Sequence, residues 1–204
     1  MRVYHYINTM FGLKDLRERR LRVSRINDLN DPFEFIGIEK VSCSVKNSVQ
    51  MQKDVVANQF GVCCFSENWK NPVQWAHYAD KHKGICLGFD ITSDELKKVE
   101  YVSELLKLED FSGGSTIRRL CRTKYKHWEY EEEHRVFVEL KEEEDGHYYL
   151  NFESNMVLKE IIIGCNSSLC LDDFKSVLNN IDEVQLFKSK PSPSVFEMLK
   201  ETLS

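Results

Sequence analysis

Three short segments, far apart in the chain, combine aromatic and ionisable residues that could act on a small molecule. They are Tyr4-His5-Tyr6, Gln74-Trp75-Ala76-His77-Tyr78 and Trp128-Glu129-Tyr130-Glu131-Glu132-Glu133-His134-Arg135. Each lies beside an apolar run typical of a strand or short helix, where a fold can hold reactive side chains rigidly over a cleft. Together they supply a histidine, a tyrosine and a glutamate, a combination that suggests one site.

The composition suits one folded domain spanning residues 1–204, since 42% of the residues are hydrophobic and 30% are charged. A formal net charge of -5 argues against a protein whose whole surface grips nucleic acid. Two local basic stretches are either solvated helix faces or anion-binding rims. The first holds Arg17, Arg19, Arg20, Arg22 and Arg25; the second holds Arg118, Arg119, Arg122, Lys124 and Lys126.

The seven cysteines form an odd set without a C-x-x-C pair, which indicates neither a disulfide framework nor a zinc ribbon. No segment approaches the ~20 consecutive apolar residues of a membrane span, and the N-terminus lacks a signal-peptide pattern. We expect a cytoplasmic protein that does not insert into a membrane.

Hydrophobic periodicity and turn residues predict an α+β fold in which helices flank a strand-rich core. The predicted strands cover residues 3–6, 21–23, 60–66, 84–89, 135–140, 148–152, 158–164 and 184–187. Of these, 135–140 and 148–152 are expected to form a hairpin around Asp145-Gly146. The predicted helices cover residues 9–19, 46–58, 72–80, 94–98, 116–122, 171–178 and 194–203, with Thr9 capping the first and a loop at residues 112–114.

Two local features bear on the expected site. Asn71 and Pro72 suit the cap and first turn of a helix, on which Gln74, His77 and Tyr78 share a face. The segment Asn27-Asp28-Leu29-Asn30-Asp31-Pro32-Phe33-Glu34 is rich in turn formers, so it should have a defined shape. It is either a purely structural turn or a loop that closes over a ligand.

A series of motifs in a fixed order carries a resemblance to known proteins. They are His5-Tyr6, Asn30-Asp31-Pro32-Phe33-Glu34, Phe65-Ser66-Glu67, Trp75-Ala76-His77-Tyr78-Ala79, Gly84-Ile85-Cys86-Leu87-Gly88-Phe89-Asp90 and Trp128-x-Tyr130-Glu131-x-Glu133-x-Arg135. Over about residues 3–164 the chain resembles a bacterial and phage family of uncharacterised function. The order of histidine, tyrosine and glutamate also resembles the H-Y-E type of ADP-ribosyltransferase, a split β-sandwich that holds NAD in its cleft.

The second resemblance implies a role for each candidate residue. His5, with Tyr6 beside it, would bind the nicotinamide-side ribose, Tyr78 would stack on nicotinamide, and Glu133 would stabilise the ribosyl cation. Ser66 would orient the ribose, the basic stretch near Arg22 and Arg25 would hold the pyrophosphate, and Glu131 would orient the acceptor. The chain departs from the arginine-specific pattern, which has arginine at the place of His5 and Ser-Thr-Ser at the place of Cys64-Phe65-Ser66.

The resemblance implies an NAD-dependent ADP-ribosyltransferase or NAD glycohydrolase that acts as a toxin or phage-defence effector. Protein, nucleic acid, a small molecule and water all stay open as acceptors. One alternative is a metal-dependent nuclease using His5, His77, Asp80, His82 and Glu133, although no compact H-x-E or D-x-E-x-K pattern supports it. Another alternative is a non-catalytic ligand-sensing or interaction module.

Two further predictions concern packing and strand faces. We expect the core to include Cys86, Leu87, Phe89, Trp128, Val136, Ile161 and Ile162. If residues 131–140 are extended, alternation places Glu131, Glu133 and Arg135 on one face and Glu132 on the other.

Overall fold

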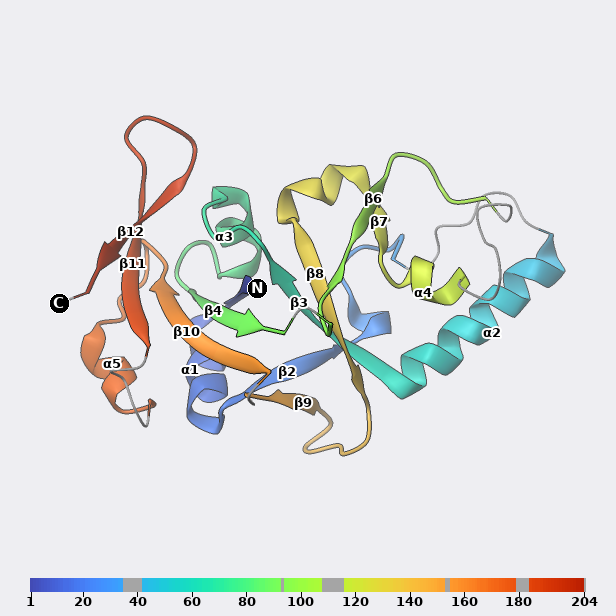
Figure 1. Cartoon of the computed structure of the whole chain (residues 1–204), viewed down its shortest axis with the longest axis horizontal. Helices are drawn as coiled ribbons and strands as arrows, with labels where there is room; N and C mark the ends of the chain where they lie inside the picture. The colour runs from blue at the N-terminus through green and yellow to red at the C-terminus, as the bar shows by residue number, and fades with distance from the viewer. Residues whose placement is uncertain (35–41, 93, 108–115, 153–154, 179–183, 204) are drawn as a thin grey trace.

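The computed structural model describes residues 1–34, 42–92, 94–107, 116–152, 155–178 and 184–203, and a ten-stranded mixed sheet forms its centre (Figure 1). The main path of the sheet is β12-β11-β10-β4-β1-β3-β2-β9, and β8 joins it by pairing with both β3 and β5. The strands are β1 (Arg2–Ile7), β2 (Arg20–Arg25), β3 (Phe60–Ser66), β4 (Ile85–Ile91), β5 (Lys97–Lys98), β8 (Glu133–Glu139), β9 (Tyr148–Asn151), β10 (Met156–Ile163), β11 (Gln185–Pro191) and β12 (Met198–Thr202).

The remaining elements surround this sheet. A separate two-stranded sheet pairs β6 (Glu100–Val102) with β7 (Thr123–Tyr125). The helices are α1 (Thr9–Glu18), α2 (Cys43–Gln59), α3 (Pro72–Tyr78), α4 (Thr116–Leu120) and α5 (Leu171–Lys175), with the 3-10 turns η1 (Ile26–Asp28) and η3 (Lys126–Glu131). In Figure 1, β11 and β12 form the left edge of the sheet, and α2 lies at the opposite end of the molecule.

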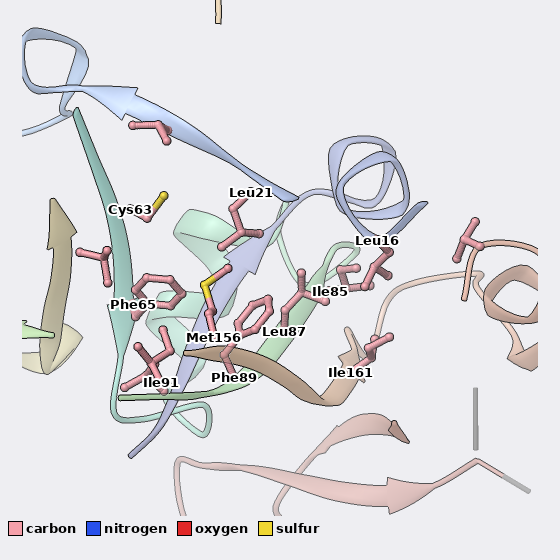
Figure 2. Close-up of a cluster of buried hydrophobic side chains, with 14 of the residues drawn as sticks. Leu16, Leu21, Cys63, Phe65, Ile85, Leu87, Phe89, Ile91, Met156 and Ile161 are labelled. Atoms are coloured by element: carbon pink, nitrogen blue, oxygen red, sulfur yellow. The ribbon is translucent and has the colours of Figure 1, made fainter. Parts of the chain in front are cut away.

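The core lies on both faces of the central strand β4. Leu87 and Phe89 pack with Ile161 in the larger cluster drawn in Figure 2. On the opposite face, Cys86 packs with Ile162 and with Trp75 of α3. Burial on both faces explains why β4 is almost wholly apolar. Gly84 precedes it because a Cβ there would lie 2.2 Å from the carbonyl oxygen of Ile7.

The predicted core set is confirmed except at one position. Cys86, Leu87, Phe89, Ile161, Ile162 and Val136 are all buried. The expectation for Trp128 is wrong, because this residue lies in η3 and is only half-buried. Its ring instead faces the Lys124 ammonium, with Nζ 5.1 Å from the ring centroid.

The main sheet is weakly joined between β1 and β3. On the side of β1 that faces away from β3, β1 pairs with β4 at six positions, from Arg2 opposite Asp90 to Ile7 opposite Ile85. With β3, the recorded pairing of the described residues is the single position of Tyr4 opposite Ser66. Beyond that pair the two strands separate, so the sheet opens at His5.

The predicted α+β class is confirmed, and most predicted elements are present. β3 spans residues 60–66 as expected, and Asn71 caps α3 by accepting a hydrogen bond from the Val73 amide at 2.8 Å. The cap of α1 is Asn8 rather than Thr9. The loop expected at residues 112–114 lies outside the described residues.

The predicted hairpin of residues 135–140 and 148–152 is wrong. β8 pairs with β3 and β5, and β9 pairs with β2 instead. The Asp145-Gly146 turn does form, with φ angles of 51° and 79°. Contacts of Arg20 explain the different partner of β9: this guanidinium binds Glu144 at 2.6 Å and lies 3.7 Å from the centroid of the Tyr149 ring.

Two predicted helices are also wrong. Residues 94–98 form a turn that leads into β5. Residues 194–203 contain β12, which pairs with β11 at five positions. Alternation explains this strand, since Met198 is buried and Lys200 reaches Glu160, whereas Leu199 between them is exposed.

Candidate functional site

A cavity of about 240 Å³ lies where the sheet opens, and we call it the polar cavity. Its lining includes His5 of β1, Ser66 of β3, Tyr78 of α3, Lys124 of β7, Glu131 of η3 and Glu133 of β8. The prediction that His5, Tyr78 and Glu133 converge on one cavity is therefore confirmed. Along the described chain, five elements lie between β1 and α3 and six lie between α3 and β8, so tertiary folding brings these side chains together.

The floor of the polar cavity is a buried cluster of three carboxylates and two cations. Glu34, Glu131 and Glu133 surround Lys124, whose Nζ lies 3.6, 2.5 and 3.0 Å from their nearest oxygens. Arg135 binds Glu34 through two nitrogens, at 2.7 and 2.8 Å. None of these side chains is more than 6% exposed. The cluster therefore carries one net negative charge when every member is ionised.

The environments of the two cavity glutamates on η3 and β8 shift their pKa values in opposite directions. Although burial opposes ionisation of Glu133, Arg135 at 2.7 Å and Lys124 at 3.0 Å lower its pKa to about 2. Glu131 binds Lys124 without a contact to Arg135 in the described structure, so desolvation prevails and its pKa is raised. Glu133 is thus permanently ionised, while Glu131 more readily accepts a proton.

Tyr78 connects this cluster to the loop of residues 27–34. Its hydroxyl donates to Glu131 Oε1 at 2.5 Å and accepts from Asn30 Nδ2 at 3.2 Å. Burial and the nearby Glu131 carboxylate raise the pKa of Tyr78, which keeps the hydroxyl protonated. The loop forms a tight turn, in which Asp31 Oδ1 accepts from the Phe33 amide, and its Asn30 and Glu34 border the cavity. Its closure over a ligand stays a prediction.

His5 lies at the opening of the sheet with one ring nitrogen already engaged. Its Nδ1 is 2.9 Å from the carbonyl oxygen of Cys64, across the gap between β1 and β3. Because a carbonyl can only accept, Nδ1 carries the proton and Nε2 is left as an acceptor. Burial lowers the pKa of His5, so the ring is neutral and suits hydrogen bonding to a hydroxyl.

Ser66 and Tyr6 line the cavity, but their hydroxyls hold the protein together. Ser66 Oγ lies 2.6 Å from the Glu131 carbonyl, and Gln74 Nε2 donates to it at 3.1 Å. Tyr6 donates to the Asn68 carbonyl at 2.8 Å. These bonds position η3 and α3 around the site, so Ser66 acts on Glu131 rather than directly on a ligand.

The structure does not bring Arg22 and Arg25 to the polar cavity. The side chain of Arg22 is exposed on β2. Arg25 lies 3.3 Å from Glu143 and 5.2 Å from the centroid of the Tyr148 ring. A phosphate of a bound ligand would therefore have to meet other groups.

As predicted, one side of this segment carries Glu131, Glu133 and Arg135. Strand alternation alone does not produce this arrangement. Glu131 ends η3, and Glu132 has a left-handed backbone with φ 46°, so strand geometry begins only at Glu133. Glu132 turns away and accepts from Asn68 Nδ2 at 2.9 Å. It is absent from the cavity lining among the described residues, as predicted.

Sequence reasoning assigned no site role to Glu34, Lys124 or Arg135. Each lies in a segment that the sequence analysis describes. Glu34 ends the turn-rich loop, Lys124 belongs to the second basic stretch, and Arg135 ends the last glutamate motif. Lys124 lies in β7 directly before η3, where it is buried together with Thr123. The opposite charges that neutralise it are distant in sequence, so only the fold reveals the cluster.

The metal ligands of the alternative nuclease are not gathered in one place. His77 and Asp80 border a separate surface cavity beside α1, and the ring of His82 stacks on Trp75. Among the described residues, no group of three or more histidine, cysteine, aspartate or glutamate side chains is placed to hold a metal ion. No helix in the same part of the chain is long and apolar enough to cross a membrane.

Comparison with protein-family models, curated proteins and solved structures found no match to this chain. The function must therefore be argued from the polar cavity itself.

Proposed function

We propose that the polar cavity binds the nicotinamide riboside half of NAD and cleaves the glycosidic bond, as an ADP-ribosyltransferase or NAD glycohydrolase. The excess of negative charge carries this proposal. The lining supplies the carboxylates of Asp28, Glu34, Glu131 and Glu133 and one cation, Lys124. Such a site favours a cationic ligand, and the nicotinamide ring of NAD and the ribosyl cation left by its departure are both cationic.

The opposite pKa shifts divide the chemistry between two glutamates. Glu133, permanently ionised and fixed by two cations, supplies a preorganised charge that stabilises the oxocarbenium-like transition state. Glu131 accepts the proton of the incoming nucleophile. Lys124 and Arg135 hold both carboxylates in place and do not contact the reacting carbon.

The aromatic residues and the opening of the sheet favour the same ligand. Tyr78 offers a ring for stacking on nicotinamide, and His5 Nε2 accepts a hydrogen bond from a ribose hydroxyl. A cavity of about 240 Å³ is smaller than the ~300 to 1,000 Å³ of drug-sized sites, so it suits half of the dinucleotide. The separation of β1 from β3 is also in keeping with the split β-sandwich that the sequence resembles.

Nicotinamide release measured by chromatography tests the proposal. Purified protein should release nicotinamide from NAD in water or with added protein and nucleic acid acceptors. NADH is the matched control, because its neutral dihydronicotinamide lacks the positive charge that makes the ring a good leaving group. Absence of release from NAD under every condition, or equal turnover of NADH, would contradict the proposed reaction.

A further inference from the structure

A second cavity of about 380 Å³ shares Lys124 with the polar cavity, since this residue lines both. Its walls include Phe33, Leu105, Leu120, Thr123 and Tyr125. This volume falls within the ~300 to 1,000 Å³ range of small-molecule sites. A ligand bound there would lie next to the buried cluster that holds Glu131 and Glu133.

Large apolar side chains remain exposed around the second cavity. Phe33 is 60% exposed, and Leu105 and Tyr125 are each 43% exposed. Apolar groups that gather at a hollow and stay open to water mark a binding site more often than a packing defect. Two of the three are aromatic. The Tyr125 ring already stacks on His127, with the centroids 4.6 Å apart, so its other face and the Phe33 ring are the surfaces on which a flat aromatic ligand would stack.

Basic residues of the second basic stretch lie close in sequence to the lining of the second cavity. Arg118 and Lys126 are exposed on α4 and η3, which adjoin lining residues of the cavity. Arg122 Nε donates to the Arg118 carbonyl at 3.2 Å, which holds the two guanidinium-bearing residues side by side. One wall carries the acidic Glu104, so a phosphate would lie towards the arginines instead. This stretch is the second basic segment of the sequence.

We infer that the second cavity binds a base of single-stranded nucleic acid and that this base is the acceptor of ADP-ribose. The inference rests on the proposed function. A nucleobase supplies the planar aromatic group, and its backbone supplies phosphates for Arg118 and Arg122. Water as acceptor would need no such cavity.

The transfer step balances with the groups present. The bond between C1′ of the ribose and the nicotinamide nitrogen breaks, and nicotinamide leaves as a neutral molecule with the electron pair. A ring or exocyclic nitrogen of the base forms the new bond to C1′. The proton that this nitrogen loses passes to the Glu131 carboxylate.

Equilibrium dialysis with labelled AMP, GMP, CMP and UMP tests the binding step without requiring turnover. At least one nucleotide should bind, and Phe33→Ala and Tyr125→Ala should each weaken it roughly tenfold or more, as loss of one stacking platform does. Phe196→Ala is the matched control, because Phe196 is 97% exposed in the connection between β11 and β12, away from the cavity lining. Failure of all four nucleotides to bind, or unchanged binding in both aromatic variants, would overturn the inference.

A transfer assay with NAD labelled on the adenylate phosphate tests the acceptor role. Mixed-sequence oligonucleotides should become labelled by the wild-type protein, and much less by Phe33→Ala when the label is expressed per nicotinamide released by each protein. Nicotinamide release without labelled oligonucleotide would overturn this inference and leave the proposed function standing. Nucleotide binding by a protein that never cleaves NAD would overturn the acceptor role together with the proposed function.

Discussion

Replacing Lys124 by methionine removes the cation shared by the three buried carboxylates. Met has a similar length and no charge, so the cluster changes from one net negative charge to two, with Arg135 left to compensate. Breaking a buried ion pair by removing one partner costs about 3–5 kcal/mol. A typical domain is stable by about 5–15 kcal/mol, so the loss is a large part of the total. At about 2–4 °C per kcal/mol for this chain length, the melting temperature should fall by roughly 6–20 °C.

Urea unfolding followed by far-UV circular dichroism measures this loss. Lys126→Met is the control, since Lys126 is exposed two residues away and its removal should change stability by less than about 0.5 kcal/mol. Adding Glu131→Gln to Lys124→Met restores one net negative charge and should recover part of the stability. Similar unfolding midpoints for Lys124→Met and Lys126→Met would refute the ion cluster.

The pH dependence of the stability of Lys124→Met tests the same ion cluster independently. In Lys124→Met the pKa of Glu131, already raised in the wild type, rises further because its nearest cation is gone. A carboxyl whose folded pKa exceeds the unfolded value loses stabilisation as pH rises. The deficit relative to wild type should therefore be largest at neutral pH and shrink in acid. A deficit that grows as pH falls from 7 to 5 would contradict the assignment.

Three further predictions follow from single residues. Leu87→Ala should destabilise the protein by about 2–5 kcal/mol in urea unfolding, because Leu87 is fully buried in β4; Leu199→Ala, 37% exposed, should cost much less. Asp15 is buried in α1 with Oδ2 unpartnered among the described atoms, and burial raises its pKa from 3.8 to about 7. Stability should fall as pH rises through this window, and Asp15→Asn should remove that slope; an unchanged slope would contradict the shift. Tyr78→Phe keeps the ring but loses the hydrogen bond to Glu131, so NAD binding should persist while nicotinamide release slows at least roughly tenfold; unchanged release would exclude a role for the hydroxyl.

Local signals in the sequence predicted the elements that local chemistry determines. The apolar run of residues 60–66 is a buried strand, and Asn71-Pro72 begins a helix, because both depend on neighbouring residues alone. The order of His5, Tyr78 and Glu133 along the chain predicted their convergence through resemblance to a fold. Strand partners were not predictable in the same way: Asp145-Gly146 makes the expected turn, but β9 pairs with β2, where Arg20 contacts Glu144 and Tyr149.

The buried charges, like the strand partners, could not be predicted from local sequence signals. Glu34 and Arg135 form a bidentate pair across a hundred residues, and Lys124 stood in a stretch that resembled a solvated basic surface. Nothing in the spacing of these residues indicates burial, since a buried ion pair is defined by partners that only the tertiary fold supplies. Met198 to Thr202 was misassigned because five residues of alternation are too few to distinguish a strand from a short amphipathic helix.

The role of Glu133 in stabilising the ribosyl cation is tested most directly by comparing two adjacent substitutions. Because Glu133 binds both Lys124 and Arg135, Glu133→Gln should also lower the melting temperature, so rates are measured in single turnover at a temperature where circular dichroism shows every variant folded. We predict that Glu133→Gln still binds NAD but releases nicotinamide about 10² to 10³ times more slowly than wild type. Glu132→Gln, whose side chain faces Asn68, should release it at the wild-type rate. Full activity in folded Glu133→Gln, or an equal loss in Glu132→Gln, would contradict the account.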